Sequence, residues 1–165
     1  MHLSPGLAQL VASWARFYRH SSITSTTIVF LHVAALIVGG GLAIALDRAT
    51  LRLHRGDAAS RAAHLADLAG AHRVVLSSLA LALVTGIALV AADLDTYVGS
   101  WIFWLKMALL VLLLANGGLM TRTESRLRTG GDAERAWRLL RPIAVTSLVL
   151  WLAITLAGVA LTNAA

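Results

Sequence analysis

The sequence predicts an all-α protein, an integral membrane four-helix bundle preceded by an amphipathic interfacial helix. The first observation is composition: 58% of the 165 residues are hydrophobic and only 13% are charged, whereas about 25% of a soluble domain is charged. The second is four apolar stretches, each near the roughly 20 residues that a helix needs to cross the hydrocarbon of a bilayer. They cover residues 23–46, 71–92, 101–120 and 143–161. We therefore expect one bundle, residues 23–165, after an N-terminal segment of residues 1–22.

The N-terminal segment carries a helical pattern of its own. Its apolar residues recur near helical spacing, with Arg16 and Arg19 between them. They are Leu7, Leu10, Val11, Trp14, Phe17 and Tyr18. The segment lacks the apolar core of a cleavable signal peptide. We expect an amphipathic helix in the membrane interface, and a disordered leader is the alternative.

Basic residues gather on one side of the predicted bundle. Of the 14 Lys and Arg residues, 11 follow the first or the third apolar stretch. The connection between the second and third stretches carries Asp93 and Asp95 and no basic residue. Because Lys and Arg accumulate in cytoplasmic loops, we expect loops 47–72 and 121–141 in the cytoplasm and both termini outside. The positive charge then indicates topology and contact with membrane lipids, not a nucleic-acid interface.

The segments between the apolar stretches indicate where the helices begin and end. Residues 47–70 contain no proline and one glycine, so much of this segment is expected to extend the second helix. Gly130 and Gly131 indicate a break, after which Asp132 is expected to cap a short helix. Pro142 suits the first turn of the fourth span, where its missing N–H costs little.

Small residues recur at every fourth position in the first two spans. They are Ala35, Gly39 and Ala43 in the first span and Ser78, Ala82 and Gly86 in the second. Small residues at this spacing let helix backbones approach closely in lipid. We interpret them as the seam between helices of one bundle, and a homodimer interface is the alternative.

Two ionisable residues fall well inside the apolar stretches, where such residues are costly and point to function. His32 lies ten positions after Ser22, so roughly 15 Å from the outer side, and Lys106 lies roughly 10 Å from the same side. We expect these two side chains to face one another in the outer half of the bundle. His72 lies about 15 Å deeper than His32, too far for the two to share one haem iron. The alternative is that Lys106 snorkels to the surface and His32 hydrogen-bonds a neighbouring helix.

Three further histidines raise the question of a metal site near the cytoplasmic side. His54, His64 and His72 follow the first span, and imidazoles are common ligands of transition metals. His64 and His72 are eight residues apart, too far for both to reach one ion from a straight helix. We interpret these histidines as part of a solvated cytoplasmic face. The chain has no cysteine, which excludes thiolate ligands and disulfides.

Short motifs around His32 and Lys106 carry a family resemblance. Phe-Leu-His-Val at 30–33, leading through three glycines to Asp-Arg at 47–48, resembles the first span of small bacterial membrane proteins of unknown function. Trp-Leu-Lys-Met at 104–107, followed by Asn116, resembles their third span. The layout is similar to the four-helix bacterial protoporphyrinogen IX oxidase and to the copper-resistance D membrane domain.

The resemblance to the oxidase implies a cofactor and a set of residues. In that family, a histidine of the first span and a lysine of a later span are linked to haem b and to activity. The resemblance therefore implies that His32, Lys106 and Arg73 bind haem b, with His32 as the metal ligand. It also implies a location in the bacterial inner membrane.

Together these features favour a haem b-binding redox protein, either oxidase-like or an electron carrier, because both need the same ligand. One alternative is a non-catalytic membrane subunit whose N-terminal helix and arginine-rich loops dock a partner membrane protein or lipid. Another is transport of copper or a small solute, although the chain has only three methionines and no cysteine to hold copper.

Overall fold

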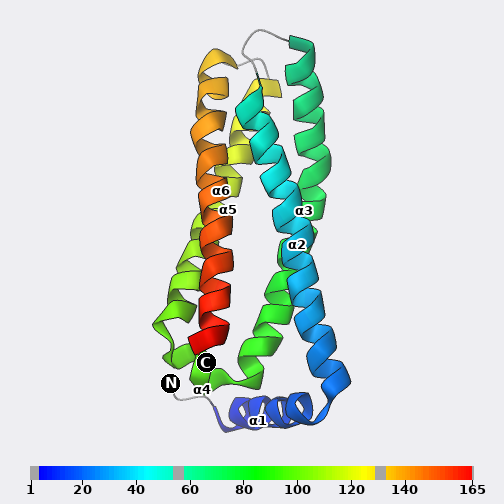
Figure 1. Ribbon diagram of the computed structural model, residues 1–165, viewed down its shortest axis with the longest axis vertical. Helices are drawn as coiled ribbons and strands as arrows, with labels where there is room; N and C mark the ends of the chain where they lie inside the picture. The colour runs from blue at the N-terminus through cyan, green and yellow to red at the C-terminus, as the bar shows by residue number, and fades with distance from the viewer. Residues whose placement is uncertain (1–3, 54–57, 129–132, 165) are drawn as a thin grey trace.

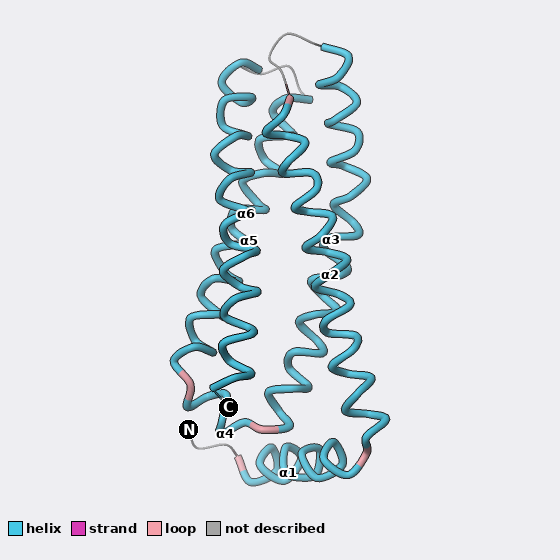
Figure 2. Tube along the Cα trace, viewed as in Figure 1, coloured by secondary structure: helices cyan, strands magenta, loops and turns pink. Residues whose placement is uncertain are grey.

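The computed structural model describes residues 4–53, 58–128 and 133–164, and within these ranges the chain is almost entirely helical (Figure 1). Four long helices and two shorter ones follow one another, and no strand occurs in the described ranges (Figure 2). The helices are α1 (Pro5–His20), α2 (Ser22–Arg52), α3 (Ala58–Ala92), α4 (Leu94–Gly99), α5 (Trp101–Arg128) and α6 (Ala133–Ala164). The predicted all-α architecture is confirmed.

The four long helices lie side by side as a bundle, and α1 lies across one of its ends (Figure 1). The C-terminal end of α6 and the short α4 lie at this same end, which we call the α1 end (Figure 1). We call the opposite end the arginine end, because exposed Arg52, Arg128 and Arg138 lie at the helix termini there.

All four long helices are long and apolar enough to cross a membrane. Even the shortest, α5, has 28 residues and so spans roughly 42 Å, against a hydrocarbon thickness of about 30 Å. Large apolar side chains cover the outward faces, and Ile37, Val84, Val111 and Leu156 are each more than 60% exposed. A soluble protein rarely exposes apolar surface continuously over four helices. The chain is therefore a membrane protein whose outward faces contact lipid.

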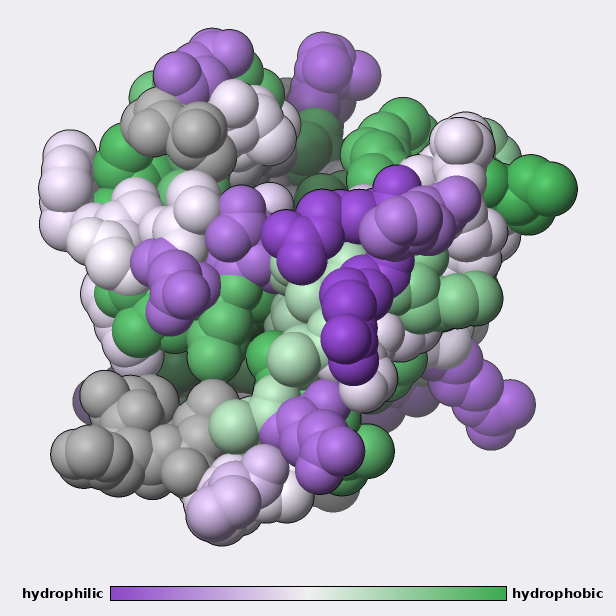
Figure 3. Space-filling model, turned by 90° about the horizontal axis from the view of Figure 1, so that it is seen from below, coloured by the Kyte–Doolittle hydropathy of each residue, from purple (hydrophilic) through white to green (hydrophobic). Residues whose placement is uncertain are grey.

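The amphipathic helix expected in residues 1–22 is present as α1. It begins with Pro5 in its first turn, where proline loses no helical hydrogen bond. Trp14 turns inward, and its indole Nε1 donates a hydrogen bond of 2.9 Å to the carbonyl oxygen of Ala88 on α3. Leu10 and Phe17 remain exposed. Viewed from the α1 end, hydrophilic side chains cross the surface, with apolar ones between and beside them (Figure 3), as suits an interfacial position.

The bundle is built from two hairpins, α2 with α3 and α5 with α6, and α2 also packs against α6. Two adjacent glycines of α2 allow α3 and α6 to approach its backbone closely. A Cβ on Gly39 would stand 2.7 Å from Cβ of Ser78 on α3, and a Cβ on Gly40 would stand 3.0 Å from the Trp151 ring on α6. The small residues of the first two spans thus form a seam within the bundle, as expected.

The fourth span departs from the expectation, because α6 is one continuous helix with Pro142 in its interior. The expected separate short helix is absent from the described part of α6, and Asp132 lies outside the described residues. The helix continues through the proline because Leu140 and Ala144 on either side are 0% exposed. Their packing offsets the roughly 3 kcal/mol that an interior proline costs.

The first span is longer than the sequence indicated, whereas the extension of the second helix was predicted. Helix α2 continues to Arg52 and α3 already begins at Ala58, so the segment 47–70 is mostly helical, as expected. The helices project beyond the apolar stretches toward the arginine end. This extension decides how the charged residues after Leu46 are oriented, as described below.

Candidate functional site: two cavities between the hairpins

Two cavities lie one after the other along the interior, each lined by side chains of α2, α3, α5 and α6. Leu79, Leu113 and Trp151 line both and separate them. The cavity toward the α1 end has a volume of about 360 Å³ and contains His32 and Lys106; we call it the His–Lys cavity. The other has a volume of about 310 Å³ and contains Asp47 and Glu124; we call it the carboxyl cavity. Both volumes lie within the range of ligand pockets.

His32 on α2 is held in one orientation by Thr85 on α3. Its Nδ1 lies 3.0 Å from the Thr85 hydroxyl oxygen. That hydroxyl donates its single hydrogen to the Leu81 carbonyl at 2.7 Å, within its own helix. With that hydrogen on the carbonyl, the threonine oxygen accepts a hydrogen from Nδ1 of His32. Neutral His32 is thus the Nδ1–H tautomer, and its Nε2 lone pair is free for a ligand.

Lys106 enters the same cavity from α5. Its Nζ lies beside α6, where a Cβ on Gly158 would be 3.5 Å away, and a Cβ on Gly86 of α3 would be 3.3 Å from Cε1 of His32. The two glycines therefore leave room for the two functional side chains. Lys106 and His32 interact electrostatically, and no carboxylate lines this cavity among the described residues. The structure thus brings His32 and Lys106 together in one cavity in the half of the bundle toward the α1 end.

The rest of the His–Lys cavity is apolar, with leucine, isoleucine and valine side chains together with Phe103 and Tyr97. A flat, apolar ligand with an anionic edge fits such a lining, because the walls accept its hydrocarbon and Lys106 its charge. Haem b has this character. A hydrogen bond at one ring nitrogen is the usual support of a histidine that binds a metal through the other, and His32 has such a bond to Thr85.

No second histidine lines this cavity in the described part of the chain. His72 lines the carboxyl cavity instead, consistent with the expectation that His32 and His72 do not form an axial pair. The described residues also contain no cluster of three His, Asp or Glu side chains that could hold a metal ion. Lys106 and the Met107 thioether are the cavity groups that could complete the coordination of a haem iron. Sequence reasoning missed Met107.

Arg73 is not brought to the other two residues that the resemblance implied. It lies on the exposed side of α3 and lines neither cavity. Its neighbour His72 turns inward at the same level of the helix. Arg73 stands near the middle of α3, where the apolar stretch 71–92 begins, and an exposed arginine at this boundary is suited to contact with lipid head groups.

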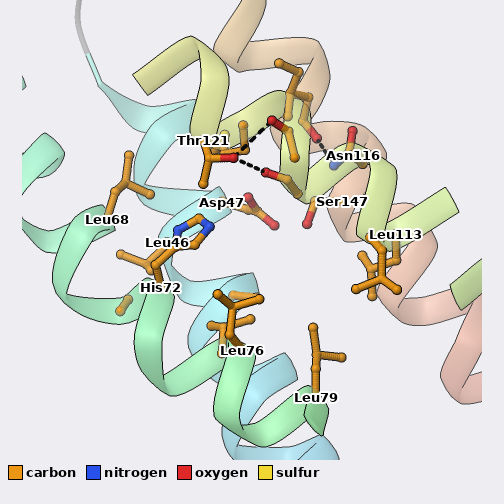
Figure 4. Close-up of a pocket in the computed structure, with 18 of the residues that line it drawn as sticks. Leu46, Asp47, Leu68, His72, Leu76, Leu79, Leu113, Asn116, Thr121 and Ser147 are labelled. Carbon is orange, nitrogen blue, oxygen red and sulfur yellow. Dashed lines mark hydrogen bonds between the residues drawn. The ribbon is translucent and has the colours of Figure 1, made fainter. Parts of the chain in front are cut away.

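The carboxyl cavity was not expected from the sequence. Asp47 on α2 is 4% exposed and Glu124 on α5 is 5% exposed, and both line the cavity together with His72. The view in Figure 4 shows Asp47 directed into the space between His72 and Ser147. Neither Oδ2 of Asp47 nor Oε1 of Glu124 has a hydrogen-bond partner. Two buried, incompletely paired carboxyl groups on facing helices are costly and call for a function.

One signal for this site was present in the sequence. Asp47 is followed by Arg48, and Glu124 comes two residues after Arg122. Both arginines are exposed, whereas both acids are buried. If the helices are extended past the apolar stretches, the acids fall on the inward faces and the arginines on the outward faces. Ending the spans at Leu46 and Met120 placed all four residues in loops.

The expectation of a solvated histidine face is wrong for His64, which is 4% exposed. Its Nε2 lies 2.7 Å from the Thr50 hydroxyl oxygen, and Thr50 donates its own hydrogen to the Leu46 carbonyl. The His64 side chain can be buried between α2 and α3 because its Nε2 has a hydrogen-bond partner there. His64 lines neither of the two cavities, and His54 lies outside the described residues.

Comparisons with family models, with curated proteins and with solved structures find no match for this chain. The resemblance to the oxidase and copper-resistance families therefore stays a prediction. What the site can do rests on the geometry of the two cavities. That geometry distinguishes a cationic, His-containing cavity from an acidic one within a single four-helix membrane bundle.

Proposed function

We propose that the chain is a haem b-binding redox protein of the bacterial inner membrane, with His32 as an axial ligand. One observation carries the proposal: Thr85 holds the His32 ring through Nδ1 at the wall of an apolar cavity of about 360 Å³. A structural histidine needs no such cavity. His64 also has a hydrogen bond to a threonine, Thr50, through Nε2, and it lines neither cavity.

Each residue of the cavity has a separate task in this proposal. His32 supplies the ligand atom, and Thr85 keeps its ring in the competent tautomer. Lys106 places a positive charge near the anionic edge of the ligand, which strengthens binding in a region of low dielectric constant. The apolar walls exclude water. Haem, when bound, would supply one-electron transfer at a potential that the axial ligand and the burial of the site set.

The proposed orientation places the arginine end in the cytoplasm and the α1 end outside, following the bias of Lys and Arg toward cytoplasmic loops. A basic cavity at the arginine end supports this placement. Arg52, Arg61, Arg138 and Arg141 surround it, and the Arg61 guanidinium lies 5.2 Å from the centre of the Trp137 ring. Such a cluster is suited to the phosphate groups of anionic lipids, which are enriched in the cytoplasmic leaflet.

The test is the visible spectrum of the detergent-purified chain before and after dithionite, with haem supplied during expression. We expect a Soret band that sharpens and shifts on reduction. His32→Ala is expected to lose most of the haem, because an axial ligand is removed. His64→Ala is the matched control, since it removes the equivalent histidine–threonine bond outside the cavities. It should retain the wild-type haem content.

Two outcomes would contradict the proposal. Equal haem content in His32→Ala and the wild type would show that His32 is not the ligand. A colourless wild type would exclude haem and would favour the non-catalytic subunit, in which α1 and the arginine end dock a partner or lipid. Co-purification of a stoichiometric partner would then be the observation to seek.

A further inference from the structure

We propose that the carboxyl cavity binds a lipophilic organic cation, a molecule with a protonated amine at one end and a hydrocarbon body. This site is independent of the haem proposal, because it lies beyond the partition that Leu79, Leu113 and Trp151 form. Three observations carry the inference: the two incompletely paired carboxyl groups, the acceptor character of the other polar groups, and the apolar remainder of the lining.

The two carboxyl groups reach the cavity from opposite hairpins. Asp47 and Glu124 are more than nine-tenths buried, and each keeps one oxygen without a hydrogen-bond partner. Glu124 interacts electrostatically with His72 and with Arg128, so this carboxyl group has an arginine as a neighbour. The Ser147 hydroxyl hydrogen-bonds Asp47, and among the described residues no lysine or arginine lines the cavity. A ligand with one positive charge would neutralise a carboxylate that is costly to bury without a charged partner.

Two further polar groups, Thr121 and Asn116, offer lone pairs to the cavity. The Thr121 hydroxyl donates to the Gly117 and Gly118 carbonyls, so its oxygen is left as an acceptor (Figure 4). Asn116 donates from Nδ2 to the Ile143 carbonyl at 3.1 Å. Its amide oxygen is an acceptor as well. A primary ammonium group has three hydrogens to donate and no lone pair, which makes it the chemical complement of this set.

The shape of the cavity separates an organic cation from a bare metal ion. Asp47, Glu124 and His72 line one cavity, yet no three acidic or histidine side chains among the described residues are close enough together to hold one ion. A volume of about 310 Å³ is in the range of small-molecule pockets. Most of the lining is apolar, including Leu46, Leu76 and the Trp151 ring. Hydrocarbon attached to the ammonium group would occupy this part.

The test is calorimetric titration of the detergent-purified full chain with decylammonium, against decanol and decanoate of the same chain length. We expect saturable binding of decylammonium alone. Asp47→Asn, which keeps the shape of the side chain, should weaken it at least tenfold, and Asp47→Asn with Glu124→Gln should abolish it. Asp67→Asn, an exposed acid of α3 near the same end, is the control and should bind as the wild type does. Size-exclusion elution shows that each variant is folded.

The proposal is overturned if the wild type does not bind decylammonium, in which case the carboxyl groups are simply protonated. It is also overturned if the double variant binds decylammonium as tightly as the wild type, or if decanol binds equally well, which would make the cavity a non-selective apolar pocket. His32→Ala should leave decylammonium binding unchanged. A colourless protein that binds the ammonium would therefore reject the haem proposal alone.

Discussion

The two cavities are built from the same four helices and have similar volumes, yet their charges are opposite. The His–Lys cavity holds Lys106 and no described carboxylate, whereas the carboxyl cavity holds Asp47 and Glu124 and no described lysine or arginine. Only the partition of Leu79, Leu113 and Trp151 lies between them. In a low-dielectric interior, one charge of either sign strongly selects the ligand that can enter. The comparison shows how a short chain can present two chemically distinct sites along one bundle.

The two cavities also differ in how the polar side chains are satisfied. In the His–Lys cavity, His32 has a defined hydrogen bond that fixes its tautomer. In the carboxyl cavity, two carboxyl oxygens have none. The first arrangement is prepared to offer a lone pair to a ligand. The second leaves Oδ2 of Asp47 and Oε1 of Glu124 without a donor, so the free energy of this half of the bundle depends on what binds there.

The largest expected effect comes from breaking the scaffold that both cavities share. Gly39→Leu should unfold or rearrange the α2–α3 hairpin, because a Cβ at this position would already stand 2.7 Å from Ser78. Overpacking of this kind costs roughly 3 kcal/mol or more. Gly41→Leu is the control, since a Cβ there meets nothing within 4 Å. Thermal unfolding followed by size exclusion measures the stability of both variants. Equal stability of the two would show that Gly39 does not lie at a close contact between α2 and α3.

A smaller but more selective effect is expected from charge reversal in the His–Lys cavity. Lys106→Glu should reduce haem content at least tenfold, because it places a negative charge near the anionic edge of the ligand. It should leave decylammonium binding in the carboxyl cavity within about twofold of the wild type. Pyridine haemochrome quantification and the calorimetric titration measure the two effects. Unchanged haem content would show that Lys106 does not face the bound ligand.

The contrast between the cavities also explains what the sequence revealed and what it did not. His32 and Lys106 stand alone in long apolar stretches, so their common depth in the bundle followed from the rise of a helix. The small-residue seam followed from spacing in the same way. The carboxyl cavity did not, because Asp47 and Glu124 lie among arginines that look like loop residues. Only the continuation of α2 and α5 past the apolar stretches turns these acids inward.

Pro142 and His64 show a second limit of sequence reasoning. Local preference placed Pro142 at a helix start and His64 in solvent, and both expectations were wrong. Packing around Leu140 and Ala144 keeps α6 continuous. A hydrogen bond with Thr50 offsets the cost of burying the His64 ring. Each outcome depends on residues from another turn or another helix. The spacing of apolar residues along one helix does not reveal which residues of other helices will pack against it.

A moderate effect is expected from removing the threonine partners of the two histidines. Thr85→Val and Thr50→Val each delete one interhelical hydrogen bond, so each should lower stability by about 0.6 kcal/mol. Only Thr85→Val should also shift the haem spectrum or its midpoint potential, because only His32 is proposed as a ligand whose orientation the threonine fixes. Redox titration of both variants measures this difference. The same shift in both variants would contradict a positioning role for Thr85.

The most local expected effect concerns α1, which covers the end of the bundle beside the His–Lys cavity. Trp14→Phe keeps an aromatic ring but removes the hydrogen bond to the Ala88 carbonyl, so it should loosen α1 by about 0.5–1.5 kcal/mol. Hydrogen exchange of α1 in nanodiscs should accelerate severalfold. Residues of the α5–α6 hairpin should exchange as in the wild type, because α1 packs against α2 and α3. Trp104→Phe, which removes a bond only to the nearby Val98 carbonyl, is the matched control. If both variants left the exchange of α1 unchanged, α1 would be held by the lipid interface rather than by α3.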